Sequence, residues 1–219
     1  MTTAPLSLVH ILRPSSITDT AAPVLFMFHG YGSNEEDLFS FANELPKELC
    51  IISVQAPYAI PPQGYAWYAI NFDADKGKWS DEDQARTSRD KMSTFIDEAC
   101  TAYGLDKTNI TLLGFSQGTI LSYAIALSYP EKIKNVIALS GYVNEAILIN
   151  DYKSKDHKNL AIYASHGSVD QVIPVSWAQQ TPAFLDGLDI EHIYEEFPIG
   201  HGVSPQNFHS FKTWLSDRI

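Results

Sequence analysis

Cysteine is scarce in this chain, whose 219 residues include only Cys50 and Cys100. A disulfide-rich scaffold is therefore excluded, and the absence of C-x-x-C and H-x-x-x-H spacings argues against a metal site. Long apolar runs are also absent, since no stretch approaches the roughly 18 residues that a transmembrane helix needs. The first residues lack the basic and apolar regions of a signal peptide. We therefore expect a cytoplasmic protein with two reduced, buried thiols and no stable membrane insertion.

Positive charge is the second shortage. The chain has 15 lysines and arginines against 26 aspartates and glutamates, which gives a net charge of -11. Nucleic acid and anionic membrane surfaces repel such a chain, so neither is an expected partner. The hydrophobic share of 45% is ordinary for a folded protein, and no repeat or linker interrupts the sequence. We expect one domain over residues 1–219, and the sequence does not decide between a monomer and a homodimer.

What the chain does have is a regular alternation of apolar runs with helical patterns. Seven strand-like runs occur: LSLVHIL at 6–12, PVLFMF at 23–28, CIISVQ at 50–55, NITLLGF at 109–115, NVIALS at 135–140, NLAIYAS at 159–165 and IEHIYEEF at 190–197. Apolar stripes at helical spacing lie between most of them, and Ser33, Ser80 and Ser204 stand where capping residues are expected. The alternation predicts an α/β fold with a mostly parallel central sheet of about seven strands and helices on both faces.

The segment LLGFSQGTI, residues 112–120, joins a strand-like run to an apolar helical run with almost no loop. A turn this sharp forces its middle residue, Ser116, toward strained backbone dihedrals. Small residues must flank it because strand and helix pass close together, and Gly114 and Gly118 meet this need. The pattern is the G-x-S-x-G nucleophile elbow, which raises a serine hydroxyl above the carboxyl end of a sheet. A glycine-rich turn with an idle serine is the alternative interpretation.

A serine hydroxyl is a weak nucleophile, so it needs a base and an acid that orients the base. In an open α/β sheet these residues follow the carboxyl ends of strands, in the order Ser, Asp or Glu, then His. Asp170 follows the sixth strand-like run and His201 follows the seventh. We therefore predict a catalytic triad of Ser116, Asp170 and His201. His166 precedes Asp170 in the same segment, and we assign it a structural hydrogen-bonding role.

An oxyanion hole requires backbone N–H groups that point at the developing negative charge. One comes from the residue after the nucleophile, here Gln117, at the start of a helix whose dipole helps. The other comes from the loop after an earlier strand, here HGYG at 29–32, where the N–H of Tyr31 is the candidate. The same glycines suggest a dinucleotide-binding loop. Glu35 occupies the position of its third glycine and Gln55 ends the next strand, so we reject that interpretation.

Five motifs together carry a family resemblance: HGYGSNEEDL, AWY, GFSQG, HGSVDQVIP and GHGVSP, which lie between residues 29 and 205. They resemble the phospholipase/carboxylesterase family of α/β-hydrolases, the group that includes acyl-protein thioesterases. The resemblance implies an α/β-hydrolase fold, the triad and oxyanion residues named above, and an acyl site bordered by the loop that carries Trp67.

Trp67 and Tyr68 lie in residues 57–83, the longest segment without a clear pattern. We expect an irregular loop here, and a loop of this length is usually functional or mobile. The two aromatic side chains are predicted to line a shallow acyl groove. Packing beneath the loop is the alternative for both. No large cap domain is expected, because residues 141–158 are too few to form one after the fifth strand-like run.

The predicted activity is that of a serine hydrolase that cleaves carboxylic esters with short or medium acyl chains. Thioesters are a further expected substrate class, and the reaction passes through an acyl-enzyme without a cofactor or a metal. The expected partner is thus a small-molecule acyl ester. Lysophospholipase or acyl-protein thioesterase activity is the alternative within the same chemistry. A non-catalytic binding protein built on a hydrolase fold is the alternative outside enzymes.

Overall fold

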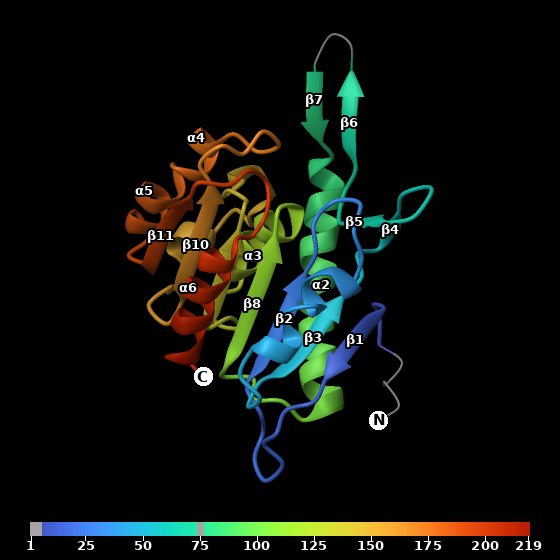
Figure 1. Cartoon of the computed structure of the whole chain (residues 1–219), viewed down its shortest axis with the longest axis vertical. Coiled ribbons are helices and arrows are strands. Elements are labelled where there is room, and N and C mark those ends of the chain that lie inside the picture. The colour runs from blue at the N-terminus through green and yellow to red at the C-terminus, as the bar shows by residue number, and fades with distance from the viewer. Residues whose placement is uncertain (1–5, 74–76) are drawn as a thin grey trace.

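In the computed structural model, which describes residues 6–73 and 77–219, a seven-stranded sheet has the order β1-β3-β2-β8-β9-β10-β11 (Figure 1). Its strands are β1 (His10–Arg13), β2 (Val24–Phe28), β3 (Cys50–Val54), β8 (Ile110–Phe115), β9 (Asn135–Leu139), β10 (Ala161–Gly167) and β11 (Glu191–Phe197). β1 pairs antiparallel with β3, and the other neighbours pair in parallel. The predicted mostly parallel sheet is confirmed, and each of the seven apolar runs supplies one strand.

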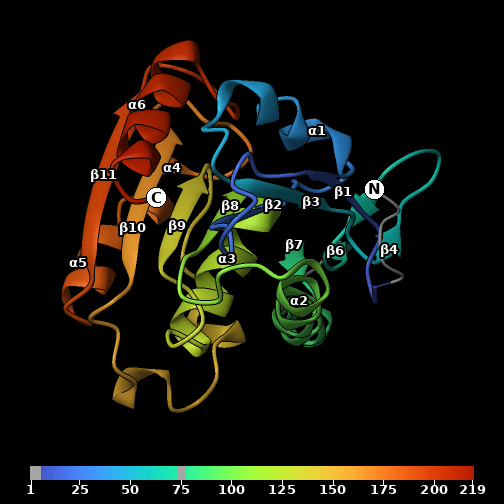
Figure 2. The ribbon, with the colours of Figure 1, turned by 90° about the horizontal axis from the view of Figure 1, so that it is seen from below.

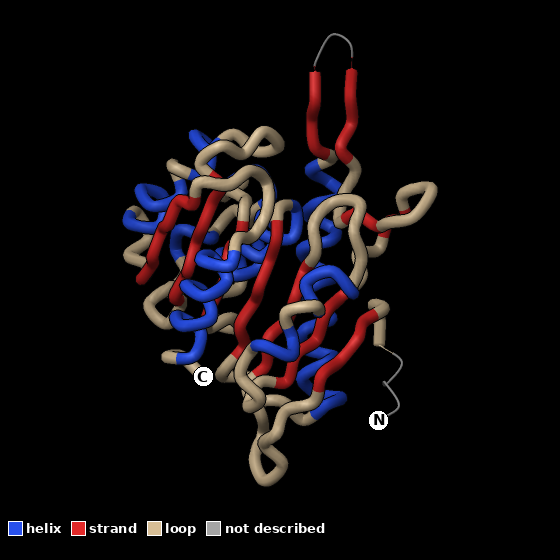
Figure 3. Tube along the Cα trace, viewed as in Figure 1, coloured by secondary structure: helices blue, strands red, loops and turns tan. Residues whose placement is uncertain are grey.

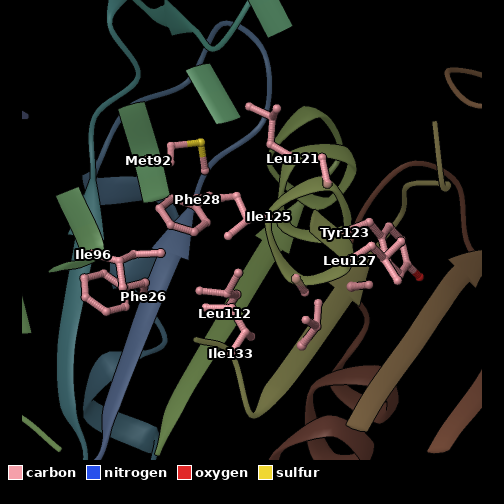
Figure 4. Close-up of a cluster of buried hydrophobic side chains, with 14 of the residues drawn as sticks. Phe26, Phe28, Met92, Ile96, Leu112, Leu121, Tyr123, Ile125, Leu127 and Ile133 are labelled. Atoms are coloured by element: carbon pink, nitrogen blue, oxygen red, sulfur yellow. The ribbon is translucent and has the colours of Figure 1, made fainter. Parts of the chain in front are cut away.

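Helices cover both faces of this sheet, as predicted (Figure 2). One face carries α1 (Glu36–Phe39), the 3-10 helix η1 (Ala42–Glu44) and α6 (Pro205–Ser216), and the other carries α2 (Glu82–Tyr103) and α3 (Gln117–Ser128). Each face buries its own apolar cluster. Figure 4 shows part of the larger cluster, where Phe26 and Phe28 of β2 lie near Met92 of α2 and Ile125 of α3.

Burial along the strands explains why the central runs are continuously apolar. Every residue of β2, β3 and β9 is buried, because helices cover both faces of these strands. β11 lies at the edge of the sheet, and its residues are exposed or half-buried. Because β2, β8, β9 and β10 are parallel, the loops that follow them all lie at the carboxyl ends of the strands, and the candidate site is expected there.

Two expected helix caps are wrong. Asp81, rather than Ser80, caps α2, and its carboxylate accepts a hydrogen bond of 3.0 Å from the N–H of Gln84. The hydroxyl of Ser33 caps nothing and donates instead to the carboxylate of Asp37, at 2.8 Å. In both places several polar side chains compete for the same backbone groups, and the sequence does not show which one reaches them.

The irregular loop expected over residues 57–83 is also wrong for residues 57–73 and 77–83, and residues 74–76 lie outside the described part of the chain. This segment forms two short antiparallel pairs, β4 (Tyr58–Ala59) with β5 (Tyr65–Ala66) and β6 (Ile70–Asp73) with β7 (Gly77–Ser80). The second pair projects beyond the body of the protein in Figure 3. Strands of two to four residues are too short to show a clear alternation of apolar and polar positions, so the sequence does not reveal them.

The connections after β9 and β10 are built from short helices and turns. Only two 3-10 helices, η2 (Glu145–Ile147) and η3 (Tyr152–Ser154), lie between β9 and β10, which leaves no room for a cap domain there. Two short helices, α4 (Val175–Ala178) and α5 (Thr181–Asp186), follow β10. Within the described residues, no helix combines the length and apolar character that crossing a membrane requires.

Candidate active site

Ser116 stands at a strained turn between β8 and α3. Its backbone dihedrals are φ 55° and ψ -115°, outside the regions that non-glycine residues ordinarily occupy. The Ser116 N–H donates to the carbonyl of Leu139 at 2.9 Å, which ties the turn to the end of β9. A Cβ on Gly118 would lie 1.9 Å from the carbonyl oxygen of Phe28, and one on Gly114 would lie 2.5 Å from that of Gly118. Side chains at either glycine would force the helix away from the sheet.

The structure brings the three predicted triad residues together. His201 Nδ1 lies 2.6 Å from Asp170 Oδ2, and His201 Nε2 lies 2.9 Å from Ser116 Oγ. Because a carboxylate only accepts hydrogen bonds, Nδ1 carries the ring hydrogen and Nε2 is left to accept from the hydroxyl. This is the arrangement in which an imidazole can take a proton from a serine.

The carboxylate of Asp170 is held in place by its own turn. Its Oδ1 accepts hydrogen bonds from the N–H groups of Val172 at 2.7 Å and Ile173 at 3.0 Å. Burial by itself raises the pKa of Asp170, but the hydrogen bonds from His201, Ile173 and Val172 outweigh it and lower that pKa below its ordinary value. The group is therefore a carboxylate at neutral pH, which suits an acid whose role is to orient a histidine.

His166 lies buried beside this carboxylate. Its Nε2 donates to the carbonyl of Ile173 at 3.0 Å and lies 3.3 Å from Asp170 Oδ2. The carbonyl of Ile173 only accepts, so Nε2 carries the hydrogen, while the buried Nδ1 has no partner among the described residues. His166 does not touch Ser116 or the cavity, and its contacts are those of a residue that braces the Asp170 turn.

The loop after β2 passes directly in front of the serine. A Cβ on Gly30 would lie 3.4 Å from Ser116 Cβ, so the backbone of this loop approaches the hydroxyl closely. Across residues 6–73 and 77–219, the N–H groups of Tyr31 and Gln117 donate to no protein acceptor. Both residues line the same cavity as Ser116. Their N–H groups are thus free to bind an oxygen of a ligand.

The side chain of Gln117 has a structural role that the sequence does not reveal. Its Oε1 accepts from the N–H of Trp67 at 2.8 Å, and its Nε2 donates to the carbonyl of Tyr68 at 2.8 Å. The amide therefore fastens the segment between β5 and β6 to the start of α3. An amide immediately after the nucleophile offers matched donor and acceptor groups, but nothing in the sequence indicates their distant partners.

Trp67 does not line the cavity, which corrects one predicted site residue. Its side chain is completely buried, packs edge-to-face on Phe28 at a centroid distance of 5.5 Å, and donates its indole N–H to the carbonyl of His29. His29 is itself fixed, because its ring nitrogens contact the carbonyl of Gly30 and the N–H of Ala56. Burial lowers the pKa of His29, so its neutral ring braces the loop after β2.

Tyr68, in contrast, does line the cavity, and burial raises the pKa of its hydroxyl. The cavity has a volume of about 1300 Å³ and reaches both Ser116 and His201. Its wall also includes Tyr142 from the loop after β9 and Trp177 from α4. These two aromatic residues were not predicted, although each follows the carboxyl end of a strand, where site residues gather.

No part of the described chain brings together three or more His, Cys, Asp or Glu side chains that could hold a metal ion. The central parallel sheet, the strained serine turn and the acid–imidazole–hydroxyl contact define an α/β-hydrolase. A family model described as Phospholipase/Carboxylesterase matches residues 14–219. The chain therefore belongs to the phospholipase/carboxylesterase family, as its motifs indicate.

Several known proteins are similar to this chain. A probable carboxylesterase of Oryza sativa subsp. japonica is 25% identical over 156 residues, which cover 70% of this chain and 58% of that protein. Acyl-protein thioesterase 1 of Mycosarcoma maydis is 25% identical in an alignment of 236 positions, gaps included, that covers 95% of this chain and 96% of that protein. The chain spans a little over half the length of the Oryza protein and of two other curated relatives.

A solved structure extends the comparison to the fold. The crystal structure of the Bacillus cereus carboxylesterase superimposes with a TM-score of 0.83 at 19% sequence identity, over 97% of this chain and 95% of that chain. At this level of identity the likeness establishes the fold alone, and it agrees with the α/β-hydrolase architecture described above.

Proposed function

We propose that this protein is a serine hydrolase that cleaves carboxylic esters with short or medium acyl chains, with thioesters as a further substrate class. The continuous contact from Asp170 through His201 to Ser116, at the wall of a large cavity, is the observation that supports it most directly. Membership of the phospholipase/carboxylesterase family supports the same chemistry. We place the enzyme in the cytoplasm, in keeping with the free, buried thiols of Cys50 and Cys100.

In the proposed reaction, Ser116 Oγ attacks the acyl carbon of the ester while His201 Nε2 takes the hydroxyl proton. The bond between the acyl carbon and the alcohol oxygen then breaks, and His201 gives its proton to the leaving alcohol. A water molecule, deprotonated by the same nitrogen, then attacks the acyl carbon. The bond between this carbon and Ser116 Oγ breaks, His201 returns the proton to Oγ, and the acid is released. The ionised carboxylate of Asp170 stabilises the imidazolium that forms in each half of the reaction.

The carbonyl oxygen of the substrate becomes negative in both tetrahedral intermediates. The N–H groups of Tyr31 and Gln117 are the proposed donors to it, because both border the cavity beside Ser116. Gln117 is the first residue of α3, so the positive end of the helix dipole adds to its effect. Each such donor contributes a factor of about 10²–10³ to turnover in known serine hydrolases. The route uses no cofactor or metal.

Hydrolysis of lysophospholipids or of acyl-protein thioesters is the second candidate function, favoured by the similarity to acyl-protein thioesterase 1 of Mycosarcoma maydis. A non-catalytic binding protein is the third. A series of soluble p-nitrophenyl esters, a thioester of the same acid and a lysophospholipid separate these candidates, with Ser116→Ala as the control. Turnover of the soluble esters by the wild type alone supports the proposal. If the wild type and Ser116→Ala hydrolyse every substrate at the same background rate, the non-catalytic binding protein is the one candidate that remains.

A further inference from the structure

The cavity around Ser116 has two chemically different ends. Toward β2 and α2, its lining residues include Asp37, Asp81, Glu82 and Asp83, together with Arg86, which pairs with Glu82 at 3.1 Å and with Asp83 at 2.6 Å. Toward β9 and β10, its wall contains Ile120, Tyr142, Val172, Ile173, Pro174 and Trp177, with Asn144 as a polar member. Figures 1 and 2 both place α4 and α2 on opposite sides of β8, the strand that ends at the nucleophile. The lining therefore changes from carboxylate-bearing residues near the start of α2 to apolar residues near α4.

This asymmetry orients a substrate. An acyl chain laid against the carboxylates would remove water from charged groups without replacing their hydrogen bonds, which is unfavourable. The same chain laid against the apolar end gains about fourfold in affinity for each methylene that it buries. An acyl chain is therefore bound more favourably beside Val172, Pro174 and Trp177 than beside the acidic residues.

The apolar end is closed by a pair of aromatic side chains. Tyr142 and Trp177 contact each other edge-to-face, with ring centroids 5.0 Å apart and planes at 70°. A second cavity of about 390 Å³ lies behind them and is lined further by Val143, Glu145, Gln180, Thr181 and Phe184. Tyr142 and Trp177 line both cavities, so this pair is the wall that the two cavities share.

We propose that Trp177, held against Tyr142, closes the acyl end of the cavity and thereby sets the longest acyl chain that is hydrolysed efficiently. This inference rests on the proposed ester hydrolysis and names a residue that determines its specificity. With the pair in place, a chain that reaches Trp177 must turn out toward solvent and gains nothing from further methylenes. Without the indole, the chain continues into the second cavity, where Val143 and Phe184 offer apolar contact.

Trp177 suits a substitution test because its side chain is 47% exposed, so its removal leaves the core intact. We would measure kcat/KM on p-nitrophenyl esters from butanoate to tetradecanoate for the wild type, Trp177→Phe and Trp177→Ala. The matched control is Val169→Ala, because Val169 is 59% exposed on the same connection and lines neither cavity. Trp177→Ala should raise the decanoate-to-butanoate ratio of kcat/KM at least about tenfold, Trp177→Phe should give a smaller rise, and the control should match the wild type.

Binding measured without turnover separates this inference from the proposed function. Calorimetric titration of Ser116→Ala, with and without Trp177→Ala, uses the linear acids from butanoic to tetradecanoic as probes. The account predicts that affinity stops rising at a shorter acid when Trp177 is present. If Trp177→Ala changes acid binding but the wild type hydrolyses no ester, the role of Trp177 in limiting chain length is upheld and the proposed ester hydrolysis is overturned. Chain-length profiles that Trp177→Ala leaves unchanged in either measurement would overturn the wall.

Discussion

His201 Nε2 lies 2.9 Å from Ser116 Oγ, although 85 residues separate the two in the chain. The contact forms because β8 and β11 run in the same direction, so the residues that follow them lie at the same end of the sheet. Asp170 reaches this end from the turn after β10, and its carboxylate contacts Nδ1, the ring nitrogen that does not face Ser116. Each of the three side chains therefore depends on a different loop, and each can be altered without touching the sheet.

Asp170→Asn should lower turnover by a factor of about 10⁴ while the protein stays folded, because an amide at this position holds the imidazole in the wrong tautomer. Steady-state kinetics on a short-chain ester check the rate, and circular dichroism checks the fold. Asp151→Asn is the control, since Asp151 precedes β10 and lies at the other end of that strand. A loss of activity in Asp151→Asn with none in Asp170→Asn would show that the acid is misassigned.

The buried thiols should be inert in the folded protein. Burial raises the pKa of Cys50 to about 11 and that of Cys100 to about 12, so both are neutral thiols at pH 8. A raised thiol pKa contributes stability that is complete below the unfolded value of about 8.5 and is lost as pH rises toward the folded values. Ellman's reagent at pH 8 should therefore react slowly with the native protein and promptly after denaturation. Rapid native labelling would contradict this burial.

Gln117→Ala should destabilise the protein, because it leaves the buried N–H of Trp67 and carbonyl of Tyr68 without partners. Each orphaned group costs about 1–3 kcal/mol. Urea unfolding measures the loss, and Gln117→Met is the matched comparison because it keeps most of the side-chain volume and removes both hydrogen bonds. Both variants should be less stable than the wild type, because the N–H of Trp67 and the carbonyl of Tyr68 stay without partners in each. Wild-type stability in both variants would show that the amide fastens nothing.

The sheet could be predicted from the sequence because its central strands are buried on both faces. Such strands have unbroken runs of apolar residues, as in β2 and β9. These runs can be recognised without knowing which strands pair with them. The helix cap at α6 could also be predicted, and the hydroxyl of Ser204 does accept a hydrogen bond from the N–H of Asn207 at 3.1 Å. The positions of Ser116, Asp170 and His201 could be predicted for the same reason, because each follows the carboxyl end of one of these strands, β8, β10 and β11.

The direction of individual side chains could not be predicted. Trp67 lies in a segment rich in aromatic and polar residues, and its inward orientation depends on the carbonyl of His29 and the ring of Phe28. Tyr142 and Trp177 meet across two connections, and neither position has a periodic pattern that would mark it. These contacts follow from tertiary packing, which a single sequence does not record.

The close packing of α3 against β2 should tolerate no side chain at Gly118. Gly118→Ala would place a Cβ 1.9 Å from the carbonyl oxygen of Phe28, so helix and strand would have to separate. We expect a loss of at least about 3 kcal/mol or failure to fold. Gly202→Ala is the matched control, because a Cβ there meets nothing within 4 Å, and its stability should stay within about 0.5 kcal/mol of the wild type. Equal stability of the two variants would contradict the close approach of helix and strand.

Covalent labelling of Ser116 by a fluorophosphonate tests the central claim most directly, since only an activated serine reacts with such a probe. The wild type should be labelled at Ser116, as identified by mass spectrometry of the modified peptide, and should lose its esterase activity in parallel. Ser116→Ala should stay folded, take no label, and show turnover reduced by a factor on the order of 10⁶. Label on another residue, or full activity in Ser116→Ala, would contradict the assignment of Ser116 as the nucleophile.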